Sequence, residues 1–361
     1  MTPTVEVFQS SGRARVYRLP MEVFPGFWAF AHLVVADGFV ALIDAGSGFG
    51  LANEHLEAAF TSVRRQHGEA VDLASLTHVL ITHAHIDHFG GLPFVRSRSR
   101  APIGVHELDL RVLTNYEQRL AIVAHRLKQF LLEAGVPAER QETLMSLYLL
   151  NKQLFSSMDV DFVFQGVEGS LGPLHWLHVP GHCPGHVVFR IDDILLVGDH
   201  VLPEISPHQS PERLSHFTGL AHYLDSLDRA LAWAPGVKIA LGGHQGPIRD
   251  LPARAAAIRE LHAARLERVL ELLQEPSTVA EVGDRLFPNA QGYHALLAIE
   301  EAGAHVEYLE QRGHLVIENL GHLHRGDLVP IRHQRRAGPL LPQPLVPQLE
   351  AIDARWRANL S

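Results

Sequence analysis

The first ninety residues alternate short apolar runs with turn residues, a pattern that predicts β-strands. The segments 32–36 and 39–43 are largely apolar and contain β-branched residues, and the dipeptide Asp37-Gly38 between them is typical of a hairpin turn. Residues 77–82 form another apolar run, which we interpret as a buried strand. Between these runs, apolar positions at helical spacing predict a helix over residues 51–67.

The middle of the chain mixes helical and strand patterns. Residues 106–158 carry leucine at helical spacing and are expected to be a helical insertion, interrupted at Gly135-Val-Pro137. Further strands are predicted at 162–164, 174–179, 187–191 and 194–197. A helix over 220–233 and a short buried strand over 237–241 complete the first 250 residues.

Beyond residue 250, three helical patterns are followed by two short apolar runs. We expect helices over 258–273, 278–287 and 294–312, and a small β wing over 314–318 and 328–331. Three helices followed by a hairpin is the order of a winged helix. The chain is therefore predicted to hold a large domain over residues 1–250 and a winged-helix-like domain over 251–361, the latter ending in a proline-rich tail with a short terminal helix.

Composition narrows the location and the chemistry. The 361 residues carry a formal net charge of −9, which disfavours general binding to nucleic acid or to anionic membranes. The N-terminus lacks the apolar core of a signal peptide, and no run of about 18 apolar residues predicts a membrane span. We therefore expect a cytoplasmic protein. Cys183 is the one cysteine, which excludes an internal disulfide, and 25 histidines point to metal or acid–base chemistry.

The densest chemistry follows the apolar run over residues 77–82. The segment Thr82-His83-Ala84-His85-Ile86-Asp87-His88 offers four nitrogen or oxygen ligands directly after a predicted strand. Neutral imidazoles together with a carboxylate form a ligand set that suits zinc. This segment is therefore a candidate metal site.

Three later strands also end in potential ligands. His182 and His186 lie in a turn of glycine and proline, Asp199 follows the strand over 194–197, and His244 follows the strand over 237–241. Because four strand-end loops each offer histidine or aspartate, we predict one shared metal site at an edge of the sheets.

These motifs resemble the metallo-β-lactamase superfamily, in its glyoxalase II-like branch. The likeness rests on His83-x-His85-x-Asp87-His88, the Pro-Gly-His182 turn, Gly198-Asp199 and Gly243-His244, and covers roughly residues 15–250. It implies an α+β fold, the αββα sandwich, in which two β-sheets are flanked by helices. It also implies two metal ions at one edge of the sandwich.

The resemblance assigns each motif residue a role. The first Zn²⁺ would be bound by His83, His85 and His182. The second Zn²⁺ would be bound by Asp87, His88 and His244. Asp199 would bridge the two ions, and Fe or Mn could replace zinc at such ligands.

Three neighbouring residues are expected to support the ligands. His186 would hold a loop or a ligand by a hydrogen bond, and Asp44 resembles a buried supporting aspartate of the family. Cys183 stands where the family usually has threonine, and we expect it to pack as a small side chain.

The chemistry follows from the ligands. Two divalent cations that share a water lower its pKa from about 15.7 towards roughly 7. The resulting metal-bridging hydroxide can attack a carbonyl carbon or a phosphorus, while a metal stabilises the developing oxyanion. Asp87 is expected to orient this nucleophile and later to handle its proton.

The helical insertion is expected to cover the metals as a lid. Its candidate pocket residues are Tyr116, His125, Tyr148, Phe155 and Met158, although each of them could equally pack the insertion's own core. An apolar lid favours a small substrate with an apolar part, such as an acyl thioester, an ester or a lactone.

The C-terminal region raises an alternative. Residues 258–331 resemble the winged-helix appendage of the β-lactamase-like protein 2 group, some members of which cut single-stranded RNA. Residues 251–361 hold 12 Arg, no Lys and 14 acidic residues, and only Arg332, Arg335 and Arg336 form a cluster. Since a phosphate-binding face needs clustered cations, we interpret the region as structural or dimer-forming.

Three functions therefore stay open. They are a dinuclear metal-dependent hydrolase of a small acyl substrate, a zinc-dependent endoribonuclease acting on single-stranded RNA, and a non-catalytic regulatory binding module. The complete ligand set disfavours the third, and the acidic charge disfavours the second. We predict the hydrolase, with a small-molecule partner, no nucleic-acid or membrane partner, and a homodimer as the candidate assembly.

Overall fold

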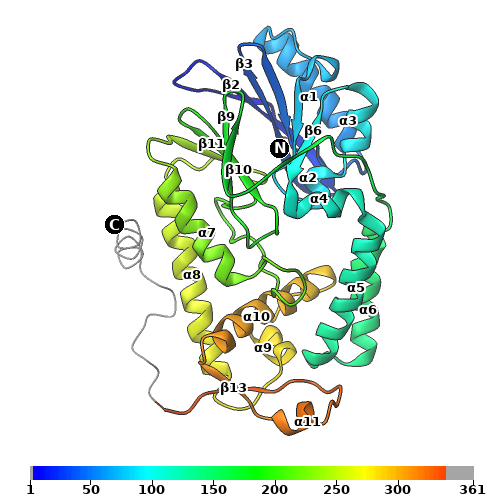
Figure 1. The fold of residues 1–361 in the computed structure, drawn as a ribbon, viewed down its shortest axis with the longest axis vertical. Helices are drawn as coiled ribbons and strands as arrows, with labels where there is room; N and C mark the ends of the chain where they lie inside the picture. Colours follow the sequence, from blue (N-terminus) through cyan, green and yellow to red (C-terminus); the bar gives the residue numbers. More distant parts are fainter. Residues whose placement is uncertain (1–2, 339–361) are drawn as a thin grey trace. The chain divides into compact units, whose positions relative to one another are not determined.

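Two β-sheets form the centre of one of the two units into which the chain divides (Figure 1). The computed structural model describes residues 3–338, so most of the predicted proline-rich tail lies outside the described residues. The first unit comprises residues 3–120, 152–207 and 229–254, and the second comprises 121–151, 208–228 and 255–338. Among the described helices, none is long and apolar enough to cross a membrane.

The first sheet contains seven strands in chain order. They are β1 (Glu6–Gln9), β2 (Arg15–Phe24), β3 (Phe27–Ala36), β4 (Phe39–Ile43), β5 (His78–Leu80), β6 (Ile103–His106) and β7 (Phe162–Phe164). Strands β1 to β4 pair antiparallel, and β4 to β7 pair parallel. The hairpin predicted at Asp37-Gly38 is confirmed, and Gly38 has a φ of 68°, which glycine adopts without strain.

The second sheet contains five strands in the order β12-β11-β10-β9-β8. They are β8 (Glu168–Leu171), β9 (Leu174–His178), β10 (Val187–Ile191), β11 (Ile194–Gly198) and β12 (Ile239–Gly242). Because β10 is antiparallel to β9 and β11, and β12 is parallel to β11, strands β9, β11 and β12 run in the same direction. The sequence did not predict β8, since its residues Glu-Gly-Ser-Leu contain no apolar run.

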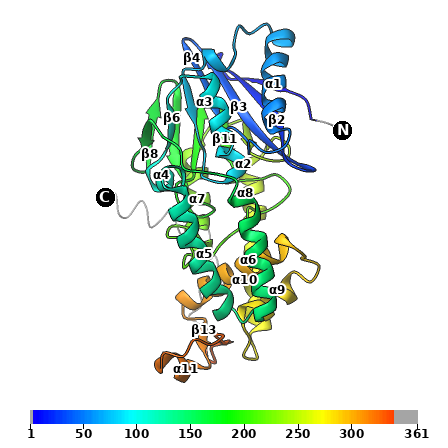
Figure 2. The same cartoon turned by 90° about the vertical axis from the view of Figure 1, so that its right-hand side faces the viewer.

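The first sheet is buried on both faces, which explains its continuous apolar runs. On β3, Leu33 belongs to a cluster with Phe60 of α1 (Ala52–His67), while Val34 belongs to a cluster with Phe189 of β10. Figure 2 shows α1 alongside β2 and β3. The predicted helix–sheet–sheet–helix sandwich is therefore confirmed.

Besides α1 and the ends of longer helices that extend into the second unit, the described part of the first unit contains four short helices. They are η1 (Leu73–Ser75), α2 (Ile86–Phe89), α3 (Leu92–Arg98) and α4 (Glu107–Thr114). On the second sheet, Arg190 of β10 donates a hydrogen bond of 2.9 Å to the carbonyl of Trp233, the last residue of α7 (Leu220–Trp233). The C-terminal turn of α7 is thus fixed to that sheet.

The second unit is helical. Its elements lie in α5 (Tyr116–Glu133), α6 (Ala138–Lys152), α7, α8 (Leu251–Leu272), α9 (Val279–Leu286), α10 (Tyr293–Gln311) and α11 (Leu320–His324). This division differs from the predicted boundary at residue 250, because residues 121–151 of the insertion group with the C-terminal helices. The contacts explain the grouping: the Ala280 N–H donates to the Ala134 carbonyl at 2.8 Å, and Arg140 pairs with Asp284 at 2.8 Å.

A small two-stranded sheet follows α10. Strand β13 (Leu315–Ile317) pairs antiparallel with β14 (His333–Arg335), and Ser277 forms an isolated bridge with His333. The second wing strand was expected at 328–331, which was wrong: Leu328 is 74% exposed, and the pairing partners of β13 lie further along the chain. The winged-helix assignment itself stays a prediction.

A polar network fixes the segment after residue 207 to α10. His208 Nε2 lies 3.0 Å from Glu300 Oε2, and His208 Nδ1 lies 3.5 Å from Glu301 Oε2. Arg265 of α8 pairs with the other oxygen of Glu301 at 2.9 Å. Burial alone lowers the pKa of His208, but its hydrogen bonds to the two glutamates outweigh this effect and raise the pKa to about 9.

Replacing His208 with Gln is expected to flatten the dependence of stability on pH. A pKa raised in the folded state stabilises the fold below the ordinary value of 6.5, and this contribution is lost as the pH rises through about 9. Chemical denaturation should show the wild type losing up to about 3 kcal/mol more than His208→Gln over that range. His222→Gln, which removes an exposed ion pair with Glu212, is the control and should follow the wild type. Identical pH profiles for the wild type and His208→Gln would contradict the prediction.

Candidate metal centre

The loop after β5 carries four of the candidate ligands. His85 is the N-cap residue of α2 and keeps an extended backbone, with φ of −97° and ψ of 145°, before the helix begins at Ile86. The change from strand to helix turns the chain, so that His83 and His85 precede the turn while Asp87 and His88 lie in the helix. His83 Nε2 and His85 Nδ1 lie 3.1 Å apart.

The ends of β9, β11 and β12 bring the other three ligands. His244 Nε2 lies 3.3 Å from an oxygen of Asp87 and 3.3 Å from an oxygen of Asp199. The other oxygen of Asp199 lies 3.5 Å from His88 Nε2, and His182 Nε2 lies 4.0 Å from Asp199 Oδ2. Two ligand atoms that share one tetrahedral zinc ion are roughly 3.3–3.5 Å apart, so these spacings suit a metal.

Six of the seven side chains form two triplets. Within each triplet the ligand atoms lie within 4.8 Å of one another; one contains His83, His85 and His182, and the other contains Asp87, His88 and His244. These are the sets that the family resemblance implied. Asp199 adjoins both triplets, since it contacts His182 of the first set and His88 and His244 of the second.

Unpaired polar atoms in the site test whether a metal fits there. His88 Nε2 and Asp199 Oδ1 are buried, and neither has a hydrogen-bond partner among residues 3–338. Orphaned buried atoms of this kind are costly unless a ligand satisfies them. Five of the seven side chains are buried, whereas His85 and Asp87 are partly exposed, so the site opens to solvent at these two residues. The residues therefore fit a metal site that a substrate can reach.

The charges in the site favour cations. Burial lowers the pKa of His83 and of His85, which keeps their rings neutral as metal binding requires. Burial raises the pKa of Asp199, but His244 and His88 outweigh it, so this carboxyl has a pKa well below its usual range. Burial lowers the pKa of His244, but its attraction to Asp199 and its hydrogen bonds to Asp199 and Asp87 outweigh burial and raise this pKa to about 10. Metal binding at the second triplet must therefore displace protons from imidazoles.

Asp44 supports the second triplet by contacting the His88 ring nitrogen that does not face the other ligands. Its Oδ2 lies 2.9 Å from His88 Nδ1 and accepts a hydrogen bond of 2.8 Å from the Thr82 hydroxyl, while its Oδ1 accepts the Thr82 N–H at 2.8 Å. Asp44 adopts a left-handed backbone with φ of 64°, which aspartate and asparagine tolerate better than most residues. The carboxylate thus fixes the direction in which His88 presents Nε2.

His186 and Cys183 differ in what they contact. Neither ring nitrogen of His186 makes a hydrogen bond within the described part of the chain, so the expected hydrogen bond from this side chain is not found there. Its ring instead stacks against His83, with centroids 4.5 Å apart. Cys183 is buried, as expected, and its thiol donates to Asp109 at 3.3 Å.

Two residues at the site, Asp109 and Phe27, were not predicted from the sequence. Asp109, in the first turn of α4, hydrogen-bonds to both loops that carry the first triplet. The exposed ring of Phe27, at the start of β3, lies 4.6 Å from the ring of His244. An acidic residue just after the β6 strand was a usable signal for Asp109, whereas no pattern connected Phe27 with a residue more than 200 positions away.

The predicted pocket residues fall into two groups. Tyr116 and Phe155 pack with Phe89 of α2, at centroid distances of 6.1 and 6.3 Å, and Met158 packs against the same core cluster. They therefore support the loop that carries the ligands. His125 and Tyr148 belong to the second unit, and the predicted lid stays a prediction.

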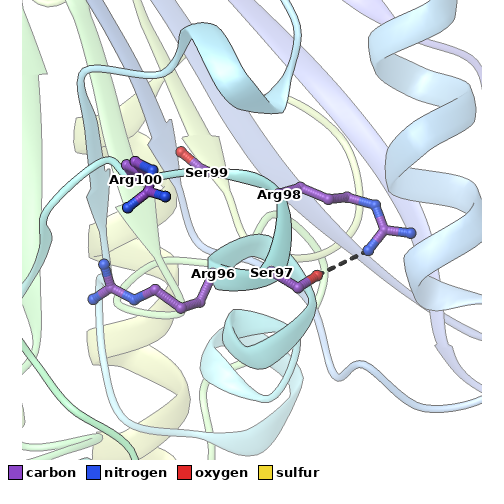
Figure 3. A pocket seen from close by; sticks show the side chains of 5 residues that line it. All are labelled: Arg96, Ser97, Arg98, Ser99 and Arg100. Carbon is purple, nitrogen blue, oxygen red and sulfur yellow. Dashed lines mark hydrogen bonds between the residues drawn. The ribbon is translucent and has the colours of Figure 1, made fainter.

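Two other polar clusters lack the features of a site. A surface pocket of about 420 Å³ is lined by Arg96, Ser97, Arg98, Ser99 and Arg100, whose side chains are drawn in Figure 3. Arg96 pairs with Asp161, Arg98 pairs with Glu57, and the end of α3 presents carbonyl groups, so an anion is disfavoured. In the second unit, His262, Glu301 and His305 gather, but Arg265 already supplies the positive charge that Glu301 needs.

This chain resembles one known protein family and two probable metallo-hydrolases. A family model described as "Metallo-beta-lactamase superfamily" matches residues 29–275. The chain is 27% identical over 299 residues to the "Probable metallo-hydrolase YqjP" of Bacillus subtilis (strain 168), which covers 77% of this chain and 86% of the relative. It is 26% identical over 173 residues to "Probable metallo-hydrolase YflN" of the same organism, which covers 45% and 55%.

Solved structures share most of the fold. The metallo-beta-lactamase family protein TTHA1429 from Thermus thermophilus is 28% identical, with a TM-score of 0.70 over 89% of this chain and 98% of that one. A beta-lactamase domain protein from Burkholderia ambifaria is 24% identical, with a TM-score of 0.68 over 92% and 94%, which shows a common fold. Both matches extend beyond the residues covered by the family model.

Replacing Asp44 with Asn should weaken metal binding at the second triplet. Asparagine tolerates the left-handed backbone but loses the charge that orients His88, so we expect about a 10–100-fold lower affinity for one of the metals. Titration against a chromophoric chelator measures this change. Asp192→Asn is the matched control, because Asp192 also has a positive φ and accepts hydrogen bonds, in a turn formed with Ser10 and Gly12. An unchanged affinity in Asp44→Asn would rule out the supporting role.

Proposed function

The chain belongs to the metallo-beta-lactamase superfamily and is a metal-dependent hydrolase, and we propose that it hydrolyses a small acyl substrate with two bound zinc ions. The substrate class is a thioester, an ester or a lactone. The superfamily membership and a hydrolase reaction disfavour the alternative of a non-catalytic regulatory module.

The position of Asp199 carries the proposal of two metals. Its two oxygens face imidazoles of both triplets, at 3.3 Å from His244, 3.5 Å from His88 and 4.0 Å from His182. A single carboxylate between two complete ligand sets supports a pair of ions that share this ligand.

The chain's own residues would arrange the reaction around the metals. Two bound divalent cations would supply Lewis acidity, which lowers the pKa of a water and polarises a substrate oxygen. Asp87 is partly exposed; burial raises the pKa of its carboxyl, but the attraction of His88 outweighs burial and holds this pKa well below its usual range. It is therefore an ionised acceptor that can orient a water and take up its proton.

An exposed aromatic side chain supports an apolar substrate. Phe27 is 45% exposed, and its ring lies 4.6 Å from that of His244. Exposed aromatic rings near polar ligands can bind the apolar part of a small acyl compound while the polar group meets the metals. This arrangement favours the acyl substrate over a phosphodiester.

The burial of α10 weighs against the endoribonuclease alternative. In a winged helix the third helix reads nucleic acid, and α10 occupies that position in the element order. Thirteen of its 19 residues are buried, so it has little surface to offer a nucleic acid. We therefore keep the structural or dimer-forming role for the C-terminal region as part of the proposal.

The purified protein loaded with zinc should hydrolyse at least one acyl class in a screen of thioesters, esters, lactones, phosphodiesters and single-stranded RNA. Activity should be lost on treatment with a chelator and should return with Zn²⁺ or Mn²⁺. Hydrolysis of RNA with no acyl activity would reverse the order of the two enzymatic proposals. A fully loaded protein that hydrolyses none of these compounds would refute both.

Replacing Asp87 with Asn should reduce kcat while leaving the fold intact. The amide keeps the size of the side chain but cannot accept a proton, so we expect a loss on the order of 10²–10⁴-fold. Steady-state kinetics with the best acyl substrate measure it. Asp72→Asn, at the surface cap of η1, is the control and should keep wild-type kinetics. A kcat within a factor of two of the wild type would exclude a catalytic role for Asp87.

A further inference from the structure

One buried carboxylate outside the ligand set joins the two loops that carry the first triplet. Asp109 is fully buried in the first turn of α4. Its Oδ2 accepts the N–H of Ala84 at 2.9 Å, and Ala84 lies between His83 and His85 in the chain. Its Oδ1 accepts the N–H of Gly185 at 2.8 Å, three residues after His182. The same side chain therefore holds all three ligands of one set through their backbones.

Cys183 adds a third donor to this carboxylate. Its thiol lies 3.3 Å from Asp109 Oδ2 and 3.5 Å from Oδ1, and both side chains are buried. The two elements also pack closely at this point, because a Cβ added to Gly185 would lie 2.6 Å from Asp109 Cγ and 2.7 Å from the Asp109 nitrogen. The spacing between α4 and the His182 loop is thus set by these contacts.

The chemistry of this carboxylate is unusual for a purely structural residue. A buried carboxylate without a cationic partner costs several kcal/mol, and Asp109 forms no ion pair within the described residues. Three donors and the N-terminus of α4 compensate for this cost. A set of three donors needs an acceptor-only side chain, since an asparagine amide would direct an N–H at one of them.

We propose that Asp109 is the positioning residue of the first metal, and that Cys183 assists it by donating a hydrogen bond from its thiol. The carboxylate holds the His83–His85 loop and the His182 loop at a fixed distance from each other. The three imidazole rings therefore already surround the first metal position before a metal binds. This inference rests on the proposed dinuclear site. Without Asp109, part of the free energy of metal binding would be spent on ordering the two loops. The affinity for the first metal would therefore fall.

The test measures metal affinity in backgrounds that keep one triplet each. In a His244→Ala background, which damages the second triplet, Asp109→Asn should lower the affinity for the remaining zinc by about 10–100-fold. In a His182→Ala background, which damages the first triplet, Asp109→Asn should leave the affinity unchanged. Competition with a chromophoric chelator gives both values without any substrate. Asp228→Asn, another buried aspartate whose partner is Arg259, is the matched control and should change neither.

A second pair of variants avoids changing Asp109 itself. Cys183→Thr and Cys183→Val have nearly the same shape, but only threonine has an O–H to donate to the carboxylate. We expect Cys183→Val to bind the first zinc roughly three- to tenfold more weakly than Cys183→Thr. Equal affinities in this pair would overturn the role of Cys183.

The outcomes separate this inference from the proposed function. If the wild type binds two zinc ions and Asp109→Asn leaves first-site affinity unchanged, the positioning role is wrong while the dinuclear centre stands. If Asp109→Asn lowers the zinc affinity equally in both backgrounds, the residue stabilises the fold in general and the inference also fails. A wild type that binds fewer than two zinc ions would refute the dinuclear centre itself.

Discussion

The buried carboxylate of Asp199 is the group on which the site depends. It lies at the end of β11, and its oxygens face imidazoles at 3.3, 3.5 and 4.0 Å that come from three other loops. Burying an ionised carboxylate is strongly unfavourable unless positive charge or hydrogen bonds compensate for it. The loops that carry the imidazoles must therefore lie close to Asp199. A pair of metal ions would compensate for the same negative charge.

The direction of the strands makes this meeting possible. Strands β9, β11 and β12 run the same way in the second sheet, so the residues that follow them lie at a common edge. Backbone contacts with the first sheet complete the arrangement: Phe30 N–H of β3 donates to the Gly243 carbonyl at 2.8 Å, and His244 Nδ1 lies 2.7 Å from the Trp28 carbonyl. The last of the ligands is thus fixed by a strand that precedes it by more than two hundred residues.

Local patterns predicted the fold well wherever the deciding interactions are local. The strands over 162–164 and 187–191 and the helix over 220–233 appear with the predicted bounds, because their periodicity and turn residues are contained in the segments themselves. The predictions failed where partners were distant. Strand β14 was misplaced because its pairing with β13 and Ser277 is not visible in its own residues. The domain boundary at residue 250 stays a prediction, although part of the insertion contacts α9.

The sequence by itself determined the superfamily resemblance, the seven candidate ligands and the strand ends that carry them. These follow from side-chain chemistry and from spacing over a few residues, and both are properties of short segments. Only the tertiary structure decided which nitrogen of each histidine faces the centre, that His186 stacks on His83 without a hydrogen bond to described residues, and that Asp109 joins two ligand loops. Such features depend on contacts between segments far apart in the chain, 25 and 76 residues for the two Asp109 hydrogen bonds, which fold topology alone brings together.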